Sequence, residues 1–393
     1  MQRYYFLWKL QTVCCKISKK NSNFAEDYCI YHILYMALHV FNPEHDLAMA
    51  SNHPMFTAPH AATSLRESLC YLSVFFAQQN DQVLVSDIEI AHRRYSQLIA
   101  NLKRCSIDVQ KHATFLTYRE LRNIVIDNVE PWGWNRRLRM DMILNGVSDR
   151  YLPTEERVLE IRDLSNRKTA AEVLTLLQTK YTVGDMRYCT ELTEVEGTLC
   201  EWRQCVVKAP WSGSGRGVRF ITIDEVTPSQ WGWVRNVISR QGGIMVEPYY
   251  NKVKDFGMEF HCDASGCVSY DGLSLFDTRN GAYTGNLLAT EDTKERIMSQ
   301  WLPVSVLHDT RDMLIYVLKQ KLKDKYVGPL GVDMMVVAKE QGSGFYLHPC
   351  VEINFRQTMG QLALKMSPSD PEVIRVMRIV HELNRYKFRI CSI

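Results

Sequence analysis

Short apolar runs alternate with amphipathic stretches along the first 165 residues of the chain. Residues 37–41 and 82–85 are apolar enough to be buried strands. Residues 63–79 carry leucines and phenylalanines at helical spacing, and residues 95–103 and 118–125 are further expected helices. Strands that alternate with helices favour a largely parallel sheet, so this part is predicted to be an α/β domain.

From about residue 200 the pattern changes to strand-length apolar runs with few helices between them. The expected strands are 201–208, 218–223, 243–248, 256–262, 268–276, 332–338 and 345–354, and the expected helices are 227–240, 290–301 and 310–323. This pattern is typical of an antiparallel α+β body. The predicted fold class is therefore α/β in the first part of the chain and α+β in the second.

The change of pattern also predicts the domain boundaries. Residues 1–35 match neither a signal peptide nor a clean amphipathic element, so we interpret them as a dispensable extension with Met36 as the natural start. Residues 36–164 form the predicted N-terminal domain. Residues 165–393 form the second domain, divided at about residue 250 into a central subdomain (165–250) and a C-terminal subdomain (251–393).

Composition excludes some classes of protein. The 393 residues carry 47 basic and 44 acidic side chains, a balance that gives no support for a nucleic-acid partner. The twelve cysteines include no Cys-x-x-Cys pair, so we expect reduced thiols in a cytoplasmic protein and no structural zinc. No run of roughly 18 apolar residues is present, so no membrane-spanning helix is expected.

The candidate chemistry begins at residues 206–220, VVKAPWSGSGRGVRF. A lysine at the end of an expected strand, Lys208, precedes a loop that contains Ser212, Gly213, Ser214, Gly215 and Gly217, and a second strand follows. A P-loop requires its lysine at the end of the loop, and a dinucleotide-binding loop must open a helix. A protein kinase requires an H-R-D motif, which is missing before the D-F-G tripeptide at 255–257. The order strand, lysine, glycine loop, strand remains.

This order resembles the ATP-grasp superfamily, and further segments agree with it in sequence order. "SNRKTAAEVL" is similar to the helix that supplies an early ATP-contacting lysine, and "GIMVEPYY" to the hinge that meets the adenine. "GPLGVDMMV" resembles the strand that carries a metal-binding acid, and "LHPCVEINFRQTMG" the final E-x-N strand. Together these segments span residues 165–362, about half of the chain.

The E-x-N segment has a physical interpretation of its own. Glu352 and Asn354 are two residues apart on an expected strand, so their side chains face the same way, while the flanking Ile353 and Phe355 face the other way. With Asp333 from a neighbouring strand they offer hard oxygen ligands, which suit Mg²⁺. The sequence predicts a magnesium site on this face.

The resemblance implies roles for further residues around the nucleotide. Lys208 and Lys168 would contact the phosphates, and the glycine loop would close over them with its backbone N–H groups. Glu247 and the main chain that follows it, at Tyr249, would hold the adenine. An acid after the hinge would meet the ribose, and the alternatives Asp255 and Glu259 remain open.

The resemblance also implies catalytic cations and a reaction. Arg356 would neutralise charge on the transferred phosphoryl group. Many family members have an arginine just before the first metal-binding acid, which this chain lacks, so Arg279 is a candidate for that role. The implied enzyme is an ATP- and Mg²⁺-dependent ligase that activates a carboxylate as an acyl phosphate and joins it to an amine. The alternatives are a kinase of the same fold and a nucleotide-binding module without turnover.

The partners are defined only by class. Small-molecule or peptide carboxylates and amines are the expected substrates, and the polar loop at 42–46 (NPEHD) is expected to contact an amino or carboxyl group. The sequence predicts no membrane partner. It leaves the oligomeric state open, a homodimer included.

Overall fold

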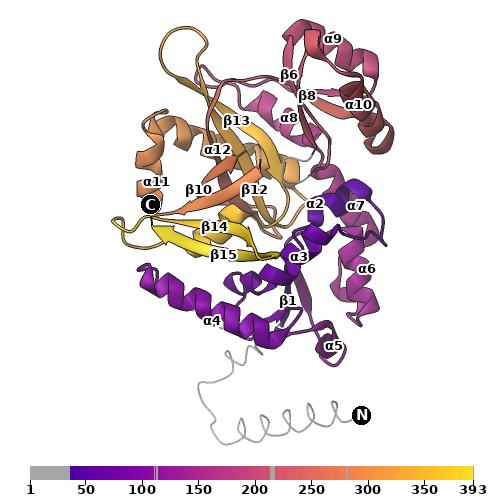
Figure 1. Ribbon diagram of the computed structural model, residues 1–393, viewed down its shortest axis with the longest axis vertical. Coiled ribbons are helices and arrows are strands. Elements are labelled where there is room, and N and C mark those ends of the chain that lie inside the picture. Colours follow the sequence, from indigo (N-terminus) through magenta and orange to yellow (C-terminus); the bar gives the residue numbers. More distant parts are fainter. Residues whose placement is uncertain (1–35, 110, 112–113, 213–216, 280–281, 393) are drawn as a thin grey trace, which may run out of the picture. The chain divides into compact units, whose positions relative to one another are not determined.

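The computed structural model describes residues 36–109, 111, 114–212, 217–279 and 282–392 (Figure 1). The predictions for residues 1–35 and for Gly213, Ser214 and Gly215 lie outside this part of the chain. Residues 36–393 form one compact unit. The strands of the described residues belong to three sheets, and each sheet takes up a continuous stretch of sequence.

The first sheet is parallel, as the alternating pattern predicts. Its strand order is β3-β2-β1-β4, and each neighbouring pair runs in the same direction. The strands are β1 (Ala37–Val40), β2 (Gln82–Leu84), β3 (Thr114–Leu116) and β4 (Asn128–Pro131). The helices of this region are α2 (His45–Ser51), α3 (His60–Leu69), α4 (Ile88–Arg104), α5 (Tyr118–Leu121), α6 (Arg136–Leu144) and α7 (Glu155–Leu164), with 3-10 turns at Cys70–Phe75 and Asp149–Tyr151.

The second sheet is antiparallel and has the order β5-β8-β6-β7. Its strands are β5 (Arg187–Cys189), β6 (Gln204–Lys208), β7 (Val218–Thr222) and β8 (Ile244–Pro248); its helices are α9 (Leu192–Trp202) and α10 (Pro228–Gln241), with a 3-10 turn at Ile223–Glu225. Helix α10 begins with a capping box between Thr227 and Gln230 and ends at Gly242, whose φ of 79° only glycine adopts readily. The sheet and both helices share a separate apolar core.

The third sheet has seven antiparallel strands in the order β13-β12-β9-β10-β11-β14-β15. The strands are β9 (Lys252–Cys262), β10 (Val268–Arg279), β11 (Ala282–Leu288), β12 (Gly328–Ala338), β13 (Phe345–Asn354), β14 (Arg375–Glu382) and β15 (Arg385–Ser392). The associated helices are α8 (Arg167–Leu176), α11 (Glu291–Met298), α12 (Val304–Leu322) and α13 (Met359–Lys365). The combination of a parallel sheet with antiparallel sheets confirms the predicted mixed class.

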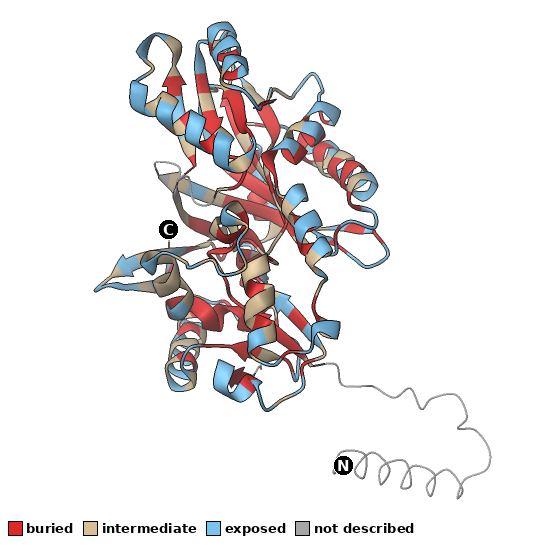
Figure 2. Ribbon diagram, turned by 90° about the vertical axis from the view of Figure 1, so that its right-hand side faces the viewer, coloured by how far each residue is buried: buried red, intermediate tan, exposed pale blue. Residues whose placement is uncertain are grey.

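Apolar side chains of the large sheet decide which of its faces is free for chemistry. Alternate residues of β9 and β12, such as Phe256, Phe260 and Val332, pack with α8 and α12 in the largest core cluster. Figure 2 shows this burial concentrated on the strands. The residues between them, including Gly257, Glu259 and Asp333, therefore face the opposite side, where the candidate site lies.

A second core joins the first sheet to the end of the chain. Phe41, Leu102 and Trp132 pack in one cluster with Met377 of β14 and Ile390 of β15. The parallel sheet and the C-terminal hairpin are therefore held together by buried apolar surface. Residues before and after position 164 thus share one core. The predicted boundary at that residue remains a prediction.

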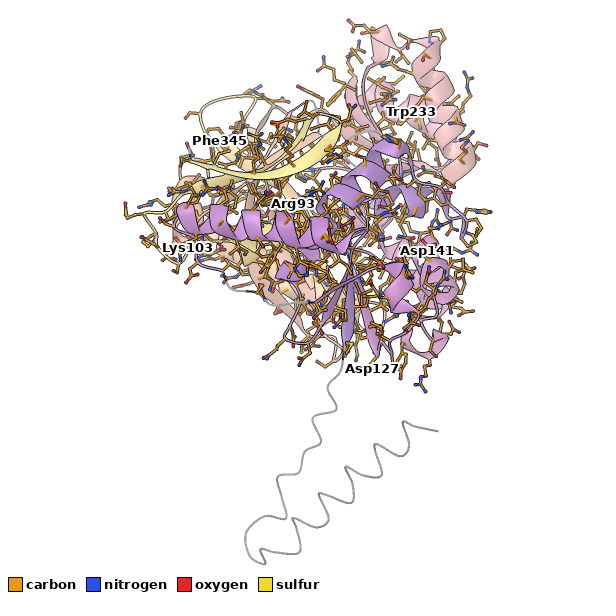
Figure 3. All side chains as sticks on the ribbon, turned by 60° about the horizontal axis from the view of Figure 1, so that its bottom comes forward. Arg93, Lys103, Asp127, Asp141, Trp233 and Phe345 are labelled. Atoms are coloured by element: carbon orange, nitrogen blue, oxygen red, sulfur yellow. The ribbon has the colours of Figure 1, made fainter. Side chains whose placement is uncertain are left out.

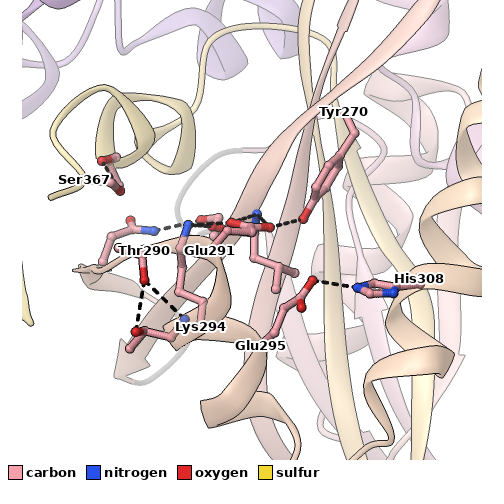
Figure 4. A network of polar contacts seen from close by, with 12 residues as sticks. Tyr270, Thr290, Glu291, Lys294, Glu295, His308 and Ser367 are labelled. Atoms are coloured by element: carbon pink, nitrogen blue, oxygen red, sulfur yellow. Dashed lines mark hydrogen bonds and ion pairs between the residues drawn. The ribbon is translucent and has the colours of Figure 1, made fainter. Parts of the chain in front are cut away.

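A buried lysine of the large sheet has a structural explanation. Lys294 of α11 donates from Nζ to the carbonyl of Leu273 at 2.6 Å and lies 3.0 Å from Glu291. The Glu291 carboxylate also accepts from Tyr270 Oη at 2.5 Å and from the Leu273 amide (Figure 4). Because these partners satisfy the charge, Lys294 fixes α11 to β10 and needs no catalytic role.

Candidate functional site

Asp333, in the middle of β12, lies beside Glu352 and Asn354 at the end of β13. Asp333 is directly opposite Glu352 in the register of the two strands, and Asn354 donates from Nδ2 to Asp333 Oδ2 at 3.1 Å. Ile353 and Phe355 are buried in the core on the other face. The register shifts immediately after Asp333, a bulge of the kind that re-aims side chains at sites.

The electrostatics of this face would favour a bound cation. Burial, and then the facing Glu352, raise the pKa of Asp333 to about 7. Two carboxylates held opposite each other are stabilised by a divalent cation, and two acids with one amide match the few protein ligands that Mg²⁺ takes beside phosphate oxygens. In the described part of the chain no group of three His, Cys, Asp or Glu side chains could hold a metal. The donor set therefore fits magnesium better than zinc.

Arg167, rather than the Lys168 singled out from sequence, is the buried cation beside these acids. Its Nη1 lies 3.0 Å from Glu352 Oε2, and its Nε donates to the carbonyl of Ala209 at 3.0 Å. Asn166 caps α8 by accepting from the Lys168 amide, which makes Arg167 the first helical residue. The Lys168 side chain is exposed. Sequence could not decide which of two adjacent cations faces the sheet.

Lys208 and Glu247 form a buried ion pair between β6 and β8. Lys208 Nζ and Glu247 Oε2 are 2.6 Å apart, and both residues are buried. Glu247 Oε1 is also buried and has no hydrogen-bond partner among the described residues. A buried acceptor without a partner is unusual, and an amino group of a bound base is a donor that would satisfy it.

His348, which no sequence motif singles out, also has buried polar atoms without a hydrogen-bond partner among the described residues. It is fully buried on β13, and neither ring nitrogen has a partner among the described residues. Burial, and then the nearby positive charge of Lys208, lower its pKa to about 3, so the ring is neutral. Its ring packs edge-on against Tyr250, with the ring centroids 5.5 Å apart. Orphan polar atoms on β8 and β13 are consistent with a ligand that has hydrogen-bonding edges.

The base of the glycine loop is narrow. Ser212 and Gly217 flank residues 213–216, and the Gly217 carbonyl accepts from the Ala209 amide at 2.8 Å. A Cβ on Gly217 would lie 2.3 Å from Ser212 Cβ, closer than side-chain atoms can approach. Gly217 is therefore required by close packing at the point where the chain leaves and re-enters the sheet.

We expect Gly217→Ala to lower kcat/KM for ATP by at least about tenfold, because the added methyl group would push Ser212 and the loop out of place. The matched control is Gly232→Ala on α10, where a Cβ meets nothing within 4 Å. That control should keep wild-type kinetics and gain about 0.5–1 kcal/mol of stability from helix propensity. Steady-state ATP turnover and thermal unfolding measure both outcomes. Unchanged kinetics in Gly217→Ala would contradict the packing argument.

Arg356 is held by an acid from the N-terminal region. Asp46 of α2 accepts from Arg356 Nε and Nη2, both at 2.9 Å, in a bidentate pair. Arg356 Nη2 also donates to Asn354 Oδ1 at 2.8 Å. The guanidinium is thereby positioned next to the acidic face. The ATP-grasp resemblance predicts Arg356 near the transferred phosphoryl group, whereas its pairing with Asp46 has no signal in the sequence.

The other polar residues of the 42–46 segment are structural. Asn42 donates from Nδ2 to the Gly133 carbonyl at 2.8 Å, and Glu44 pairs with Arg66. His45 is buried, and burial lowers its pKa to about 4. The expectation that this segment is a loop is corrected for His45 and Asp46, which begin α2. Asp46 is the member in contact with Arg356. Contact of this segment with an amino or carboxyl group of a substrate stays a prediction.

The remaining residues that the sequence predicts to contact the nucleotide or the phosphoryl group are Asp255, Tyr249 and Arg279. The Asp255 carboxylate accepts from Lys252 Nζ and Thr278 Oγ1, both at 2.6 Å. Its contact with the ribose remains a prediction.

Tyr249 is 51% exposed, and its backbone amide donates to the Gln204 carbonyl. Its backbone carbonyl would be the group that accepts from the adenine. Arg279 is the last residue of β10. A narrow pocket connects Asp46, Ser212 and Glu352 with Arg356 and Trp211.

Glu259, the alternative ribose ligand, is buried below the acidic face. Its Oε2 accepts from Thr358 Oγ1 at 2.8 Å, and Gly331 and Gly360 pack against its carboxyl group. Burial, and then the negative charges of Asp333 and Asp271, raise its pKa to about 8. An acid that is enclosed and protonated at neutral pH is poorly placed to bind ribose hydroxyls from solvent.

The raised pKa of Glu259 predicts a pH dependence of stability. Its pKa is higher in the folded protein than the ordinary 4.5, so the unfolded chain loses this proton first as pH rises. The contribution of Glu259 to the free energy of unfolding is therefore full below pH 4.5 and falls as pH rises to about 8. Glu259→Gln should gain stability relative to wild type over this window in urea titrations. The exposed Glu340→Gln should show no such trend, and a flat difference for Glu259→Gln would contradict the assignment.

No protein-family model matches the sequence, and no curated protein does. Among solved structures, N5-carboxyaminoimidazole synthetase from Staphylococcus aureus complexed with ADP is similar, with 14% identity over 88% of this chain and 82% of that chain (TM-score 0.45). A biotin carboxylase–β-γ-ATP complex from Campylobacter jejuni has 13% sequence identity over 88% of this chain and 76% of that chain (TM-score 0.49). D-alanyl-alanine synthetase A from Vibrio cholerae has 16% sequence identity over 61% of this chain and 71% of that chain (TM-score 0.37). Because these identities are low, the function is inferred from the chain's own residues.

The helices and the cysteines can be compared with the expectations of no membrane-spanning helix and of reduced thiols. Across the described ranges, every helix is too short or too polar to cross a membrane. The nine cysteines in the same ranges are free thiols, and five of them are buried. The prediction of reduced thiols is consistent with this arrangement.

Proposed function

We propose that the chain is an ATP-dependent ligase of the ATP-grasp type, which activates a carboxylate and joins it to an amine. The observation that carries the proposal is the face formed by Asp333, Glu352 and Asn354, with Arg167 and Arg356 in direct contact with it. The two acids would hold a cation and the two arginines would meet phosphoryl oxygens, and all four come from segments that resemble the ATP-grasp motifs.

The magnesium would be held by Asp333, Glu352 and Asn354. When bound, Mg²⁺ supplies charge neutralisation for the phosphate oxygens. Lys208 and Glu247 would lie at the nucleotide: the lysine offers positive charge to phosphate, and the free Oε1 of the glutamate offers an acceptor to the base amino group. Arg167 would stabilise negative charge that develops during phosphoryl transfer, next to Glu352.

The reaction would proceed in two steps. A carboxylate oxygen of the first substrate attacks the γ-phosphorus of ATP in line, the bond to the β,γ-bridging oxygen breaks, and ADP leaves. The amine nitrogen of the second substrate then attacks the acyl carbon, loses a proton and expels inorganic phosphate. Arg356, fixed by Asp46, would orient the acyl phosphate, and a closed glycine loop would exclude the water that hydrolyses it.

Amine dependence separates this proposal from a kinase of the same fold. We expect a screen of amino acids and dipeptides to contain combinations in which phosphate release from ATP requires both a carboxylate and an amine. Mass spectrometry of such a mixture should show an amide and no stable phosphoester. A phosphoester formed without an amine would instead establish the kinase, and ATP binding with no turnover in any mixture would favour the regulatory module.

A further inference from the structure

A long groove lies between α4 and the C-terminal strand β15, in a different part of the molecule from the acidic face. Its volume is about 770 Å³. We call it the cationic groove, and it is defined by three arginines of α4 and three cations of β15: Arg93, Arg94, Arg104, Arg385, Lys387 and Arg389. None of the described residues that line it is acidic. Figure 3 shows α4, with Arg93 and Lys103 labelled, alongside the yellow C-terminal hairpin.

The groove runs along the edge of β15 and not against one of its faces. Every residue from Arg385 to Cys391 lines it, odd and even positions alike. Side chains of one face alone would contribute only every second residue. Since β15 is the last strand in the order of its sheet, this edge has no neighbouring strand among the described residues.

The hairpin geometry determines which backbone groups point into the groove. The turn between β14 and β15 consists of two residues, Leu383 and Asn384, both with positive φ. In such a hairpin the residues next to the turn form the first hydrogen-bonded pair, here Glu382 with Arg385. The backbone N–H and C=O groups of the even-numbered Tyr386, Phe388 and Ile390 therefore point outwards.

The hydrogen bonds agree with this assignment. The Tyr386 amide donates to Ser68 Oγ of α3 at 3.3 Å, so α3 occupies the outer edge at this end of β15. Within the described residues, no such contact occupies the amides of Phe388 and Ile390, which leaves this stretch of the edge open. Open donors and acceptors along a strand edge are a template for another strand.

The cations beside this edge are only partly neutralised. Lys387 and Arg389 pair with Glu382 of β14 at 3.2 and 2.5 Å, and Arg94 donates to the carbonyls of Glu67 and Ser68. Arg93 and Arg385 are exposed, and neither has an ion-pair partner in the described ranges. The groove thus keeps an excess of positive charge.

We propose that the cationic groove binds an extended acidic peptide segment, which adds as a strand to the free edge of β15. Alternate residues of an extended peptide repeat about every 7 Å, which is also the spacing of Arg385, Lys387 and Arg389 along β15. Acidic side chains at alternate positions would therefore meet the three cations in register. Backbone hydrogen bonds would provide affinity and the charges would select the sequence.

The same features favour a peptide over a nucleic acid. A sugar–phosphate backbone could pair with the cations but has no row of N–H donors for the outward carbonyls of β15. Single-stranded nucleic acid also relies on exposed aromatic rings on which bases stack. The aromatic residues of β15, Tyr386 and Phe388, pack against the core shared with the first sheet. This inference does not depend on the proposed ligase activity.

The test uses the full chain and fluorescein-labelled octapeptides in anisotropy titrations at low salt. We expect saturable binding of a peptide that alternates glutamate with threonine, and at least tenfold weaker binding of its lysine–threonine counterpart. A glutamate–threonine peptide with every second amide N-methylated should also bind at least tenfold more weakly, because it loses the edge hydrogen bonds. An oligouridylate of eight nucleotides serves as the polyanion control.

Matched variants locate the binding site. Arg93→Glu and Arg385→Glu should each weaken binding of the acidic peptide at least fivefold without changing ATP turnover. Arg235→Glu, the same change at an exposed position of α10, should leave binding intact. The proposal is overturned if the acidic peptide does not bind, if N-methylation has no effect, if oligouridylate binds as tightly, or if Arg235→Glu weakens binding as much as Arg93→Glu.

Discussion

Glu352→Gln is expected to reduce Mg²⁺-dependent ATP turnover by at least about 100-fold while the protein remains folded. The amide keeps the shape of the side chain and an oxygen acceptor for Arg167, which lies 3.0 Å from Glu352. It removes one of the two negative charges that face each other between β12 and β13. The cation would lose an anionic ligand, and the charge of the transferred phosphoryl group would be less well neutralised.

The stability of this variant is set by two opposing changes. Removing the Glu352 charge relieves a repulsion with Asp333, whose pKa that charge raises, but it also removes the counter-charge of the buried Arg167. Thermal unfolding without Mg²⁺ should therefore shift only slightly, because the amide oxygen still accepts from Arg167. A rise in the Mg²⁺ concentration needed for half-maximal turnover would accompany the loss of rate.

The control for this experiment is Asp312→Asn. Asp312 is an acid of α12 that pairs with Arg311 on the surface, away from the proposed metal face. Its variant should keep wild-type turnover and the wild-type Mg²⁺ requirement. Full activity of Glu352→Gln at limiting Mg²⁺ would show that this carboxylate does not hold the cation, and the proposed site would have to be abandoned.

Lys208→Ala is expected to have the second large effect, and it should act on stability as well as on binding. Lys208 Nζ is 2.6 Å from Glu247 Oε2 and both residues are buried. Truncation would leave the Glu247 charge buried without its partner, which costs about 3–5 kcal/mol of unfolding free energy. Nucleotide affinity should also fall, because a cation next to the phosphates is lost.

A double variant separates the two effects. Lys208→Met combined with Glu247→Leu replaces the pair by apolar side chains of similar size, a change that is often neutral or stabilising. It should recover most of the unfolding free energy in urea titrations and still bind ATP at least about tenfold more weakly, as measured by calorimetry. If the stable double variant bound ATP as tightly as wild type, Lys208 and Glu247 would be a structural pair and no part of the nucleotide site.

Much of the fold follows from local pattern. The parallel order of the first sheet follows from its alternation of strands and helices. Strand β13 has the predicted bounds, and β12 begins four residues before its predicted start and ends where predicted. Helix α10 is also close to its prediction, since its capping box and Gly242 mark its ends locally. Other elements depend on tertiary contacts: β14 and β15 carry many charges, and their apolar residues are recognised only when packed on the first sheet.

Some residues of the candidate site also follow from local sequence pattern, and others depend on the tertiary structure. Spacing of two along a strand was enough to place Glu352 and Asn354 on one face, because side chains of a strand alternate. The order of lysine, glycine loop and strand was enough to single out Lys208. Neither pattern could choose Arg167 over Lys168, since the choice depends on where the Asn166 cap begins the helix relative to the sheet.

The sequence by itself determined the strands that carry Asp333, Glu352 and Asn354 and predicted them as metal ligands, because periodicity and residue chemistry are local properties. Only the tertiary structure decided that Asp46 holds Arg356, residues more than three hundred positions apart in the chain. It alone decided that Lys208 and Glu247 neutralise each other and that the edge of β15 lies open beside the arginines of α4. Contacts of this kind arise when sheets pack, and nothing in the spacing of residues along one segment specifies the partner on another.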